Sequence, residues 1–245
     1  MMEYTPSVEA GDGSAEAFVY TPGDGPHPGL LFYTDLFGIR PANQGIAKRF
    51  AEAGYTVLMP NVFYRYGNLP LLDFEFQMGE ERSMKVIGPL FGSLTAANME
   101  KDAPHYVEAL LNRNDVAGDK IAVVGYCFTG AMALRTAAVV PDKIAAAASF
   151  HGGRLVMEDP DSPHTRIAQV KAELYFGHAV EDQSATPAQI AKLDNTLKGW
   201  GGQFQSEMYE GALHGWTTPG REIYNEKQAE RAFGKMLDLM KRNIG

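Results

Sequence analysis

The stretch VVGYCFTG, residues 123–130, contains the only cysteine of this 245-residue chain. Residues that favour β-strands precede Cys127, and a helical segment is expected from Phe128 onward. Gly125 stands two positions before the thiol, where a glycine lets a strand and a helix pack closely around a sharp turn. The thiol therefore has two interpretations: a small buried apolar residue, or a nucleophile held at the end of a strand.

A helix that begins beside Cys127 directs its amide groups toward the sulfur. The partial positive charge of a helix N-terminus favours the thiolate form of a cysteine. The usual compact motif is Gly-x-nucleophile-x-Gly. Here Thr129 occupies the last place of that motif, and Gly130 follows one residue later.

Apolar strand-like runs alternate with amphipathic helical segments along the rest of the chain. We expect buried strands at residues 29–33, 55–60, 120–126, 144–150, 173–176 and 203–209, with an edge strand at 15–20. We expect helices at residues 46–53, 95–111, 128–139, 187–197 and 222–242. Strands separated by helices of this length pair in parallel and have helices on both faces. No change of composition marks a second domain, so the sequence predicts one doubly wound, mainly parallel α/β domain over residues 1–245.

The composition narrows the function classes. A net charge of −8 argues against a nucleic-acid partner or an anionic membrane surface, because both require basic residues. A single cysteine excludes internal disulfides and zinc sites built from cysteine clusters. The first residues do not resemble a signal peptide, and no apolar run approaches the roughly 18 residues of a membrane span. We therefore expect a soluble cytoplasmic protein.

A nucleophilic cysteine needs a base and a group that orients the base. In hydrolases of this topology the chain order is nucleophile, acid, histidine, each after a different strand. Asp182 follows the predicted strand AELYFG, and His214 follows the predicted strand FQSEMYEGA. Order and position both match, although Glu181 is a rival for Asp182.

These stretches resemble the dienelactone hydrolase family over nearly the whole chain. The resemblance is carried by DLFG at 35–38, VVGYCFTG at 123–130, the Asp182 loop with Pro187, and ALHGW at 212–216. It implies an α/β-hydrolase fold and a hydrolase of small carboxylic esters or lactones. It also implies that Cys127 is the nucleophile, His214 the base and Asp182 the orienting acid, with a thioester acyl-enzyme. The backbone amides of Leu36 and Phe128 would form the oxyanion hole.

The chain departs from the family pattern around the substrate. The family has an acid, usually Glu, that contacts the resting thiol, and Asp35 stands at that position. The arginine expected four residues after the histidine is replaced by Thr218, which leaves Arg221 and Arg82 as candidates for binding a substrate carboxylate.

Further substrate-binding candidates are Tyr64, Trp216 and His151, the last of which is equally compatible with an ordinary hydrogen-bonded loop histidine. Residues 61–95 are expected to be less regular. Their large apolar side chains either cover the core or line a pocket; they are Phe63, Tyr64, Tyr66, Phe74, Phe76, Met78 and Phe91.

Several other sites are considered and set aside. No dinucleotide or phosphate-loop motif occurs, and we expect no cofactor. His178, Glu181 and Asp182 could suggest metal ligands, but a metal would remove the acid from the triad, so we expect none. His27, His105 and His164 are interpreted as surface residues.

The alternative function is a non-catalytic thiol redox switch or ligand-binding protein that retains the fold. A serine esterase is disfavoured because no Gly-x-Ser-x-Gly occurs. The expected partner is a small-molecule ester or lactone, with neither nucleic acid nor membrane, and the protein is expected to be a monomer or a small homo-oligomer.

Overall fold

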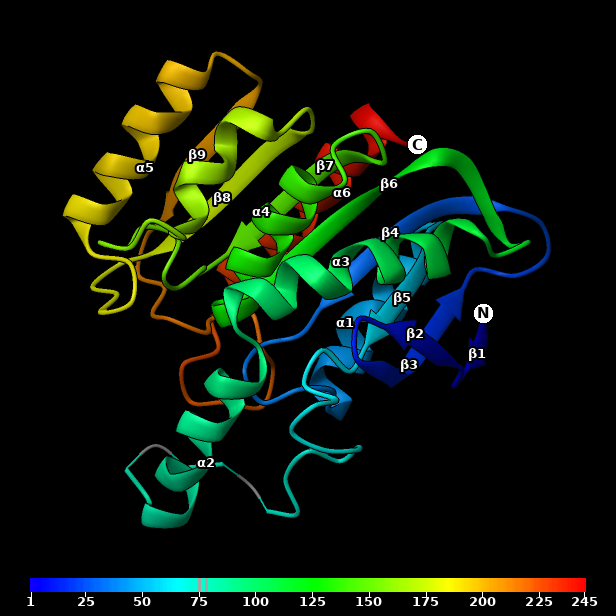
Figure 1. The fold of residues 1–245 in the computed structure, drawn as a ribbon, viewed down its shortest axis with the longest axis horizontal. Helices are drawn as coiled ribbons and strands as arrows, with labels where there is room; N and C mark the ends of the chain where they lie inside the picture. Colours follow the sequence, from blue (N-terminus) through cyan, green and yellow to red (C-terminus); the bar gives the residue numbers. More distant parts are fainter. Residues whose placement is uncertain (75, 78) are drawn as a thin grey trace.

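The computed structural model describes residues 1–74, 76–77 and 79–245. Its centre is a sheet of nine strands within these residues, ordered β1-β3-β5-β4-β6-β7-β8-β9, with β2 paired to β3 beside this path (Figure 1). The strands are β1 (Met2–Tyr4), β2 (Ser7–Ala10), β3 (Gly13–Thr21), β4 (His27–Tyr33), β5 (Thr56–Pro60), β6 (Val116–Tyr126), β7 (Ile144–Phe150), β8 (Glu173–Ala179) and β9 (Phe204–Tyr209).

All strand pairs from β5 to β9 are parallel, and β3 joins β5 in the antiparallel direction. The predicted mainly parallel α/β sheet is thereby confirmed. The expectation of an edge strand at 15–20 is wrong in its position, because β1 pairs with the outer side of β3 and β2 also pairs with it. The parallel strands all end at one side of the sheet, where ligand sites of such folds are found.

Helices cover both faces of the sheet. The helices are α1 (Pro41–Glu52), α2 (Glu81–Ser93), α3 (Ala96–Leu111), α4 (Gly130–Val139), α5 (Pro187–Trp200) and α6 (Glu226–Asn243). In Figure 1, α3, α4 and α5 lie in front of the sheet and α6 passes behind it. Successive residues of a strand point to opposite faces. Accordingly, Leu31 of β4 packs in the core under α3 and α4, and its neighbour Leu30 packs in the core under α1 and α6.

Local signals account for several helix ends. Thr95 caps α3 by accepting the amide of Asn98, and Thr186 with Gln189 forms a capping box at the start of α5. Gly201 ends α5 in the left-handed conformation, with a φ of 76°.

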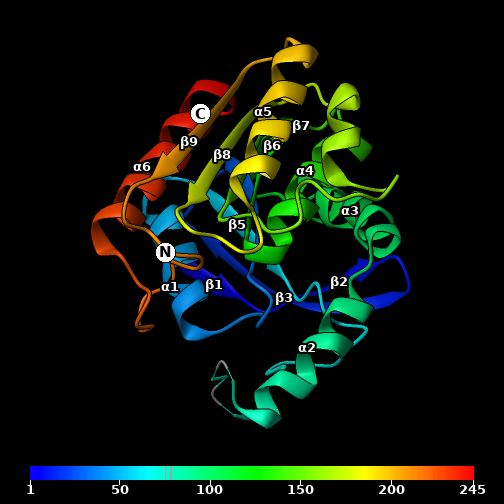
Figure 2. The same cartoon turned by 90° about the vertical axis from the view of Figure 1, so that its left-hand side faces the viewer.

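Helix α2 corrects the expectation that residues 61–95 are irregular. Gly88, Pro89 and Gly92 all lie inside this helix, and residues of both types disfavour helix, so the sequence pattern did not predict it. The helix projects away from the sheet in both views (Figures 1 and 2).

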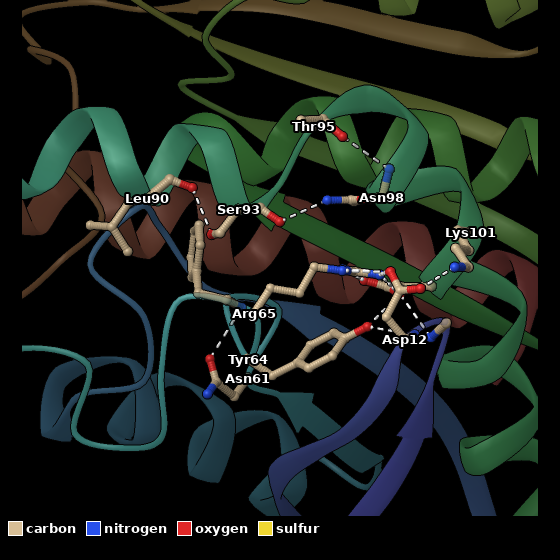
Figure 3. Close-up of polar contacts among 12 residues, drawn as sticks. Asp12, Asn61, Tyr64, Arg65, Leu90, Ser93, Thr95, Asn98 and Lys101 are labelled. Atoms are coloured by element: carbon tan, nitrogen blue, oxygen red, sulfur yellow. Dashed lines mark hydrogen bonds and ion pairs between the residues drawn. The ribbon is translucent and has the colours of Figure 1, made fainter.

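A charged network ties the segment before α2 to the body of the molecule (Figure 3). Arg65 donates to both carboxylate oxygens of the buried Asp102 at 2.6 and 2.8 Å, and to Asp12 at 2.6 Å. Tyr64 donates to Asp102 and accepts from the amide of Asp12, and Lys101 pairs with Asp12. These bonds join the β2–β3 turn, residues 61–67 and α3.

Within the described residues, no helix is both long and apolar enough to span a bilayer.

Candidate active site

The chain turns sharply at Cys127, between β6 and α4. Cys127 has a φ of 57°, a value that residues other than glycine rarely adopt. Gly125 is required beside this turn, because a Cβ there would overlap the carbonyl oxygen of Thr129 and lie 2.6 Å from its carbon. The strained turn raises the half-buried thiol at the carboxyl end of β6.

Thr129 explains the departure from the compact glycine motif. Its hydroxyl lies 2.7 Å from the carbonyl oxygen of Thr34 and accepts the amide of Tyr126 at 3.1 Å. The side chain therefore fastens the turn to the end of the neighbouring strand β4. Gly130 begins α4, and a Cβ there would lie 2.9 Å from the Cα of Gly152.

The three candidate residues meet at one point. His214 Nε2 lies 3.1 Å from Cys127 Sγ, and His214 Nδ1 lies 2.7 Å from Asp182 Oδ2. The three side chains follow β6, β8 and β9, as the sequence predicted for their positions. Glu181, the rival acid, has no such contact with His214 among the described residues.

The charges of Cys127, His214 and Asp182 stabilise one another. Burial lowers the pKa of His214, but its hydrogen bonds to Asp182 and Cys127 and the charges of both partners raise the pKa to about 10. Burial raises the pKa of Asp182, but the hydrogen bonds to His214 and Ser184 hold that pKa below its usual value. Asp182 is therefore a carboxylate at neutral pH, and the arrangement stabilises a protonated His214.

Ser184 is a neighbour that the sequence reasoning missed. Its hydroxyl lies 2.6 Å from Asp182 Oδ1 and 3.1 Å from His214 Nδ1, and its amide donates to the same Oδ1 at 2.8 Å. The signal was present, because an aspartate often accepts the amide two residues later in a turn.

His151 is buried beside the Cys127 turn, and the buried Trp216 packs against His151. His151 Nδ1 accepts the amide of Cys127 at 3.0 Å, and its Nε2 lies 2.8 Å from Thr217 Oγ1. Trp216 is fully buried against His151, with ring centroids 4.9 Å apart. Both residues are substrate-binding candidates from the sequence, and His151 was also interpreted as an ordinary hydrogen-bonded loop histidine. Its bonds to Cys127 and Thr217 match the second interpretation.

The two backbone amides that the sequence predicted for the oxyanion hole, those of Leu36 and Phe128, lie in the segments that follow β4 and β6. Among the described residues, neither of these amides donates to a backbone carbonyl outside its own helix or strand. Asp35 is buried, accepts the amide of Phe37 at 3.1 Å and pairs with Arg40. No hydrogen bond between Asp35 and Cys127 occurs among the described residues.

Two cavities of about 280 Å³ each are lined in part by the segments that follow β4 and β6, at Phe37 and Phe128. Phe37 and Arg221 line the first together with Phe74 and Phe76. Phe128 and Phe91 line the second, and their rings are in edge-to-face contact at 4.4 Å.

The aromatic residues of 61–95 thus divide between the two predicted roles. Phe63 is buried in the core and Tyr64 and Tyr66 pack against it, whereas Phe74, Phe76 and Phe91 line cavities. Met78 lies outside the described residues.

The remaining substrate-binding candidates lie in different places. Arg221 is in the first cavity, 5.5 Å above the ring of Phe37. Arg82 pairs with the exposed Asp73 at 2.6 Å. Tyr64 belongs to the network of Asp12 and Asp102, and the structure does not bring it to Cys127.

Two histidines outside the group also have defined partners. His164 is buried and hydrogen-bonded to Ser162 at 2.6 Å, so its interpretation as a surface residue is wrong. His178 Nε2 lies 3.1 Å from Ser206 Oγ, on the neighbouring strand β9.

Comparison with known proteins shows the family of the chain. The family model described as "Dienelactone hydrolase family" matches residues 15–244. The hydrolase tropI of Talaromyces stipitatus is 28% identical over 206 residues, covering 82% of this chain and 75% of that protein. A carboxymethylenebutenolidase of Rhodococcus opacus is 25% identical over 186 residues, covering 76% of this chain and 68% of that protein.

Solved structures show the same fold. A dienelactone hydrolase-like promiscuous phosphotriesterase from metagenomic libraries superimposes with a TM-score of 0.80 at 20% identity, over 100% of this chain and 99% of that one. The family match spans most of the chain, and the sheet with its helices is the fold that this solved structure shares. This chain therefore belongs to the dienelactone hydrolase family and is a hydrolase with the α/β-hydrolase fold.

Proposed function

We propose that this protein hydrolyses small carboxylic esters or lactones through a thioester formed on Cys127. The observation that supports this most directly is the continuous contact from sulfur to imidazole to carboxylate, at 3.1 and 2.7 Å. A nucleophile, a base within hydrogen-bond reach and a group that orients the base are the parts that covalent acyl transfer requires.

In the first half of the reaction, His214 holds the proton of the thiol and the Cys127 thiolate attacks the carbonyl carbon. The amides of Leu36 and Phe128 stabilise the oxyanion that develops, which is a role preformed donors fill at low energetic cost. The C–O bond breaks, and His214 gives its proton to the departing alkoxide. A lactone substrate stays attached to the enzyme, because its alcohol and acyl groups belong to one molecule.

In the second half, His214 accepts a proton from water as the water attacks the thioester. The C–S bond then breaks, and the released Cys127 thiolate either accepts the proton from His214 or forms an ion pair with the protonated His214. Asp182 remains ionised throughout and stabilises the imidazolium. A thiolate is a good leaving group as well as a good nucleophile, so activated esters, enol esters and strained lactones suit this site better than amides.

The recognition of the substrate rests on the first cavity. We propose that its aromatic walls bind an apolar or ring portion and that Arg221 receives a carboxylate. Arg82 is a weaker candidate, because Asp73 already pairs with its guanidinium. Asp35, whose carboxylate Arg40 neutralises, would act on the thiol through the position of the Leu36–Phe37 backbone.

The experiment compares wild type with Cys127→Ala and His214→Ala on a panel of aryl esters and enol lactones. We expect turnover by wild type only, and a mass increase equal to one acyl group on Cys127 after rapid quenching. His105→Ala, on the surface-facing side of α3, is the matched control and should retain activity. If wild type and Cys127→Ala are equally inert, and Cys127 instead forms reversible oxidised adducts, the hydrolytic proposal is wrong and the redox alternative replaces it.

A further inference from the structure

His151 connects the two loops that carry Cys127 and His214. It follows β7, in the sequence SFHGG, and its φ is 41°. One ring nitrogen, Nδ1, accepts the amide of Cys127 at 3.0 Å. The other, Nε2, lies 2.8 Å from the hydroxyl of Thr217, three residues after His214.

The surroundings determine which nitrogen of His151 carries the proton. The ring is 1% exposed and packs against Trp216 and against His214, whose ring centroid is 5.1 Å away. Burial, and then the nearby positive charge of His214, lower the pKa of His151 well below 6.5. The ring is therefore neutral and has one proton. Since Nδ1 accepts the Cys127 amide, that proton is on Nε2 and is donated to Thr217.

The bond from Cys127 to His151 acts on a peptide whose orientation matters for the reaction. Cys127 and His151 both have positive φ values, 57° and 41°, which non-glycine residues maintain only when their surroundings hold them. The Cys127 amide, which donates to His151, directly precedes the Phe128 amide in the chain. Rotation of this turn would redirect both the sulfur and the Phe128 amide.

We propose that His151 is a positioning residue for the proposed cysteine-based hydrolysis. Its neutral ring holds the Cys127 peptide so that Sγ and the Phe128 amide face the same carbonyl group, and through Thr217 it fixes the His214 loop relative to that peptide. This inference rests on the proposed function, and the ring itself touches neither substrate nor the reacting atoms.

Two substitutions separate the two hydrogen bonds. In His151→Asn, the side-chain oxygen replaces Nδ1 as acceptor, and asparagine tolerates positive φ. In His151→Gln, the amide reaches toward Thr217 but no acceptor remains at the Nδ1 position. We expect His151→Gln to lower kcat on the order of 100-fold with little change in KM, which is the effect of a displacement of about 1 Å at a reacting group. His151→Asn should recover most of that loss.

A second reaction distinguishes positioning from a general loss of structure. Alkylation of Cys127 by iodoacetamide occurs at an sp³ carbon and needs no oxyanion hole. His151→Gln should therefore keep an alkylation rate close to that of wild type while ester turnover falls. Equal losses in both reactions, or an unchanged kcat in His151→Gln, would overturn the proposal.

Two further measurements do not depend on substituting His151. Thr217→Val removes the acceptor for Nε2–H and should lower kcat, and Thr217→Ser should retain it. Long-range ¹H–¹⁵N spectra of the wild-type protein should show His151 protonated on Nε2. An Nδ1–H tautomer contradicts the inference. An inactive wild type with the Nε2–H tautomer would instead refute the proposed function alone.

Discussion

Ser184 and Asp182 are joined by two hydrogen bonds, one from the serine amide at 2.8 Å and one from its hydroxyl at 2.6 Å, both to Oδ1. Asp182 Oδ2 is thereby left to His214. Hydrogen bonds to a charged acceptor are stronger than those between neutral groups and fix the direction in which a carboxylate points. Ser184, in the same loop, therefore orients the Asp182 carboxylate independently of the contact with His214.

The Ser184 hydroxyl should contribute to turnover without contacting the substrate. We expect Ser184→Ala to lower kcat about tenfold, the effect of losing one hydrogen bond to a charged group. Ser184→Thr keeps the hydroxyl and should retain more activity than Ser184→Ala. Steady-state kinetics on one aryl ester measures both. An Ala variant as active as wild type would show that the amide alone orients Asp182.

The raised pKa of His214 predicts how its titration responds to the thiol. Burial lowers the pKa of His214, but the hydrogen bond and charge of Cys127, with those of Asp182, raise it to about 10. Cys127→Ala removes one of these two partners, so the midpoint of the His214 titration should fall. NMR chemical shifts of the imidazole Hε1 proton measure this midpoint. Ser14→Ala, at an exposed site, is the control and should leave it unchanged. A midpoint that does not fall in Cys127→Ala contradicts the contact.

The raised pKa of His214 also makes the free energy of unfolding depend on pH. A group whose pKa is higher in the folded state than in the unfolded state stabilises the fold fully below its unfolded pKa. This stabilisation is lost as pH rises through the folded pKa. For His214 the window extends from 6.5 to about 10. The free energy of unfolding of wild type, relative to His214→Gln, should therefore decrease across this window in urea titrations. A difference that grows with pH would reverse the sign and exclude the protonated pair.

Gly125 should be irreplaceable for a steric reason. In Gly125→Ala the new Cβ would lie 2.6 Å from the carbonyl carbon of Thr129 and 2.9 Å from the amide nitrogen of Gly130, and backbone atoms cannot move away easily. We expect a destabilisation of about 1–3 kcal/mol, typical of overpacking, together with loss of turnover. Gly45→Ala in α1 is the matched control, because no atom lies within 4 Å of its new Cβ. Alanine there should stabilise the helix by up to about 1 kcal/mol. Thermal unfolding of both variants tests the contrast.

The sequence predicted those features that depend on local patterns. Buried apolar runs locate the strands, and the residues after β6, β8 and β9 follow from that placement, which is why Cys127, Asp182 and His214 could be named together. Helix α2 escaped prediction because Gly88, Pro89 and Gly92 together oppose the local preference for helix, whereas α3 was predicted from its regular apolar spacing despite Pro104.

Hydrogen-bond partners outside Cys127, Asp182 and His214 could not be predicted when they are distant in sequence. His151 bonds Thr217 across 66 residues, and no spacing rule connects them. Asp35 matches its family position, but the nearby Arg40 engages its carboxylate, and only the folded geometry reveals this choice. For the same reason the sequence left His151 open between a substrate-binding residue and an ordinary loop histidine.

Arg221 provides a test of substrate charge. No described residue forms an ion pair with its guanidinium, which lies above Phe37 in the first cavity. Arg82 differs, because it pairs with Asp73 at 2.6 Å and stacks on Phe74. Losing a hydrogen bond to a charged group costs about 1.5–3 kcal/mol, or roughly 10- to 100-fold in binding.

Arg221→Gln should therefore raise KM by that factor for an ester with a free carboxylate and leave KM for its neutral methyl ester nearly unchanged. Arg82→Gln is the control and should leave KM nearly unchanged for both substrates. Equal effects of Arg221→Gln on both substrates would show that the arginine only supports the wall of the cavity, because a lost charge contact must discriminate between a carboxylate and its ester.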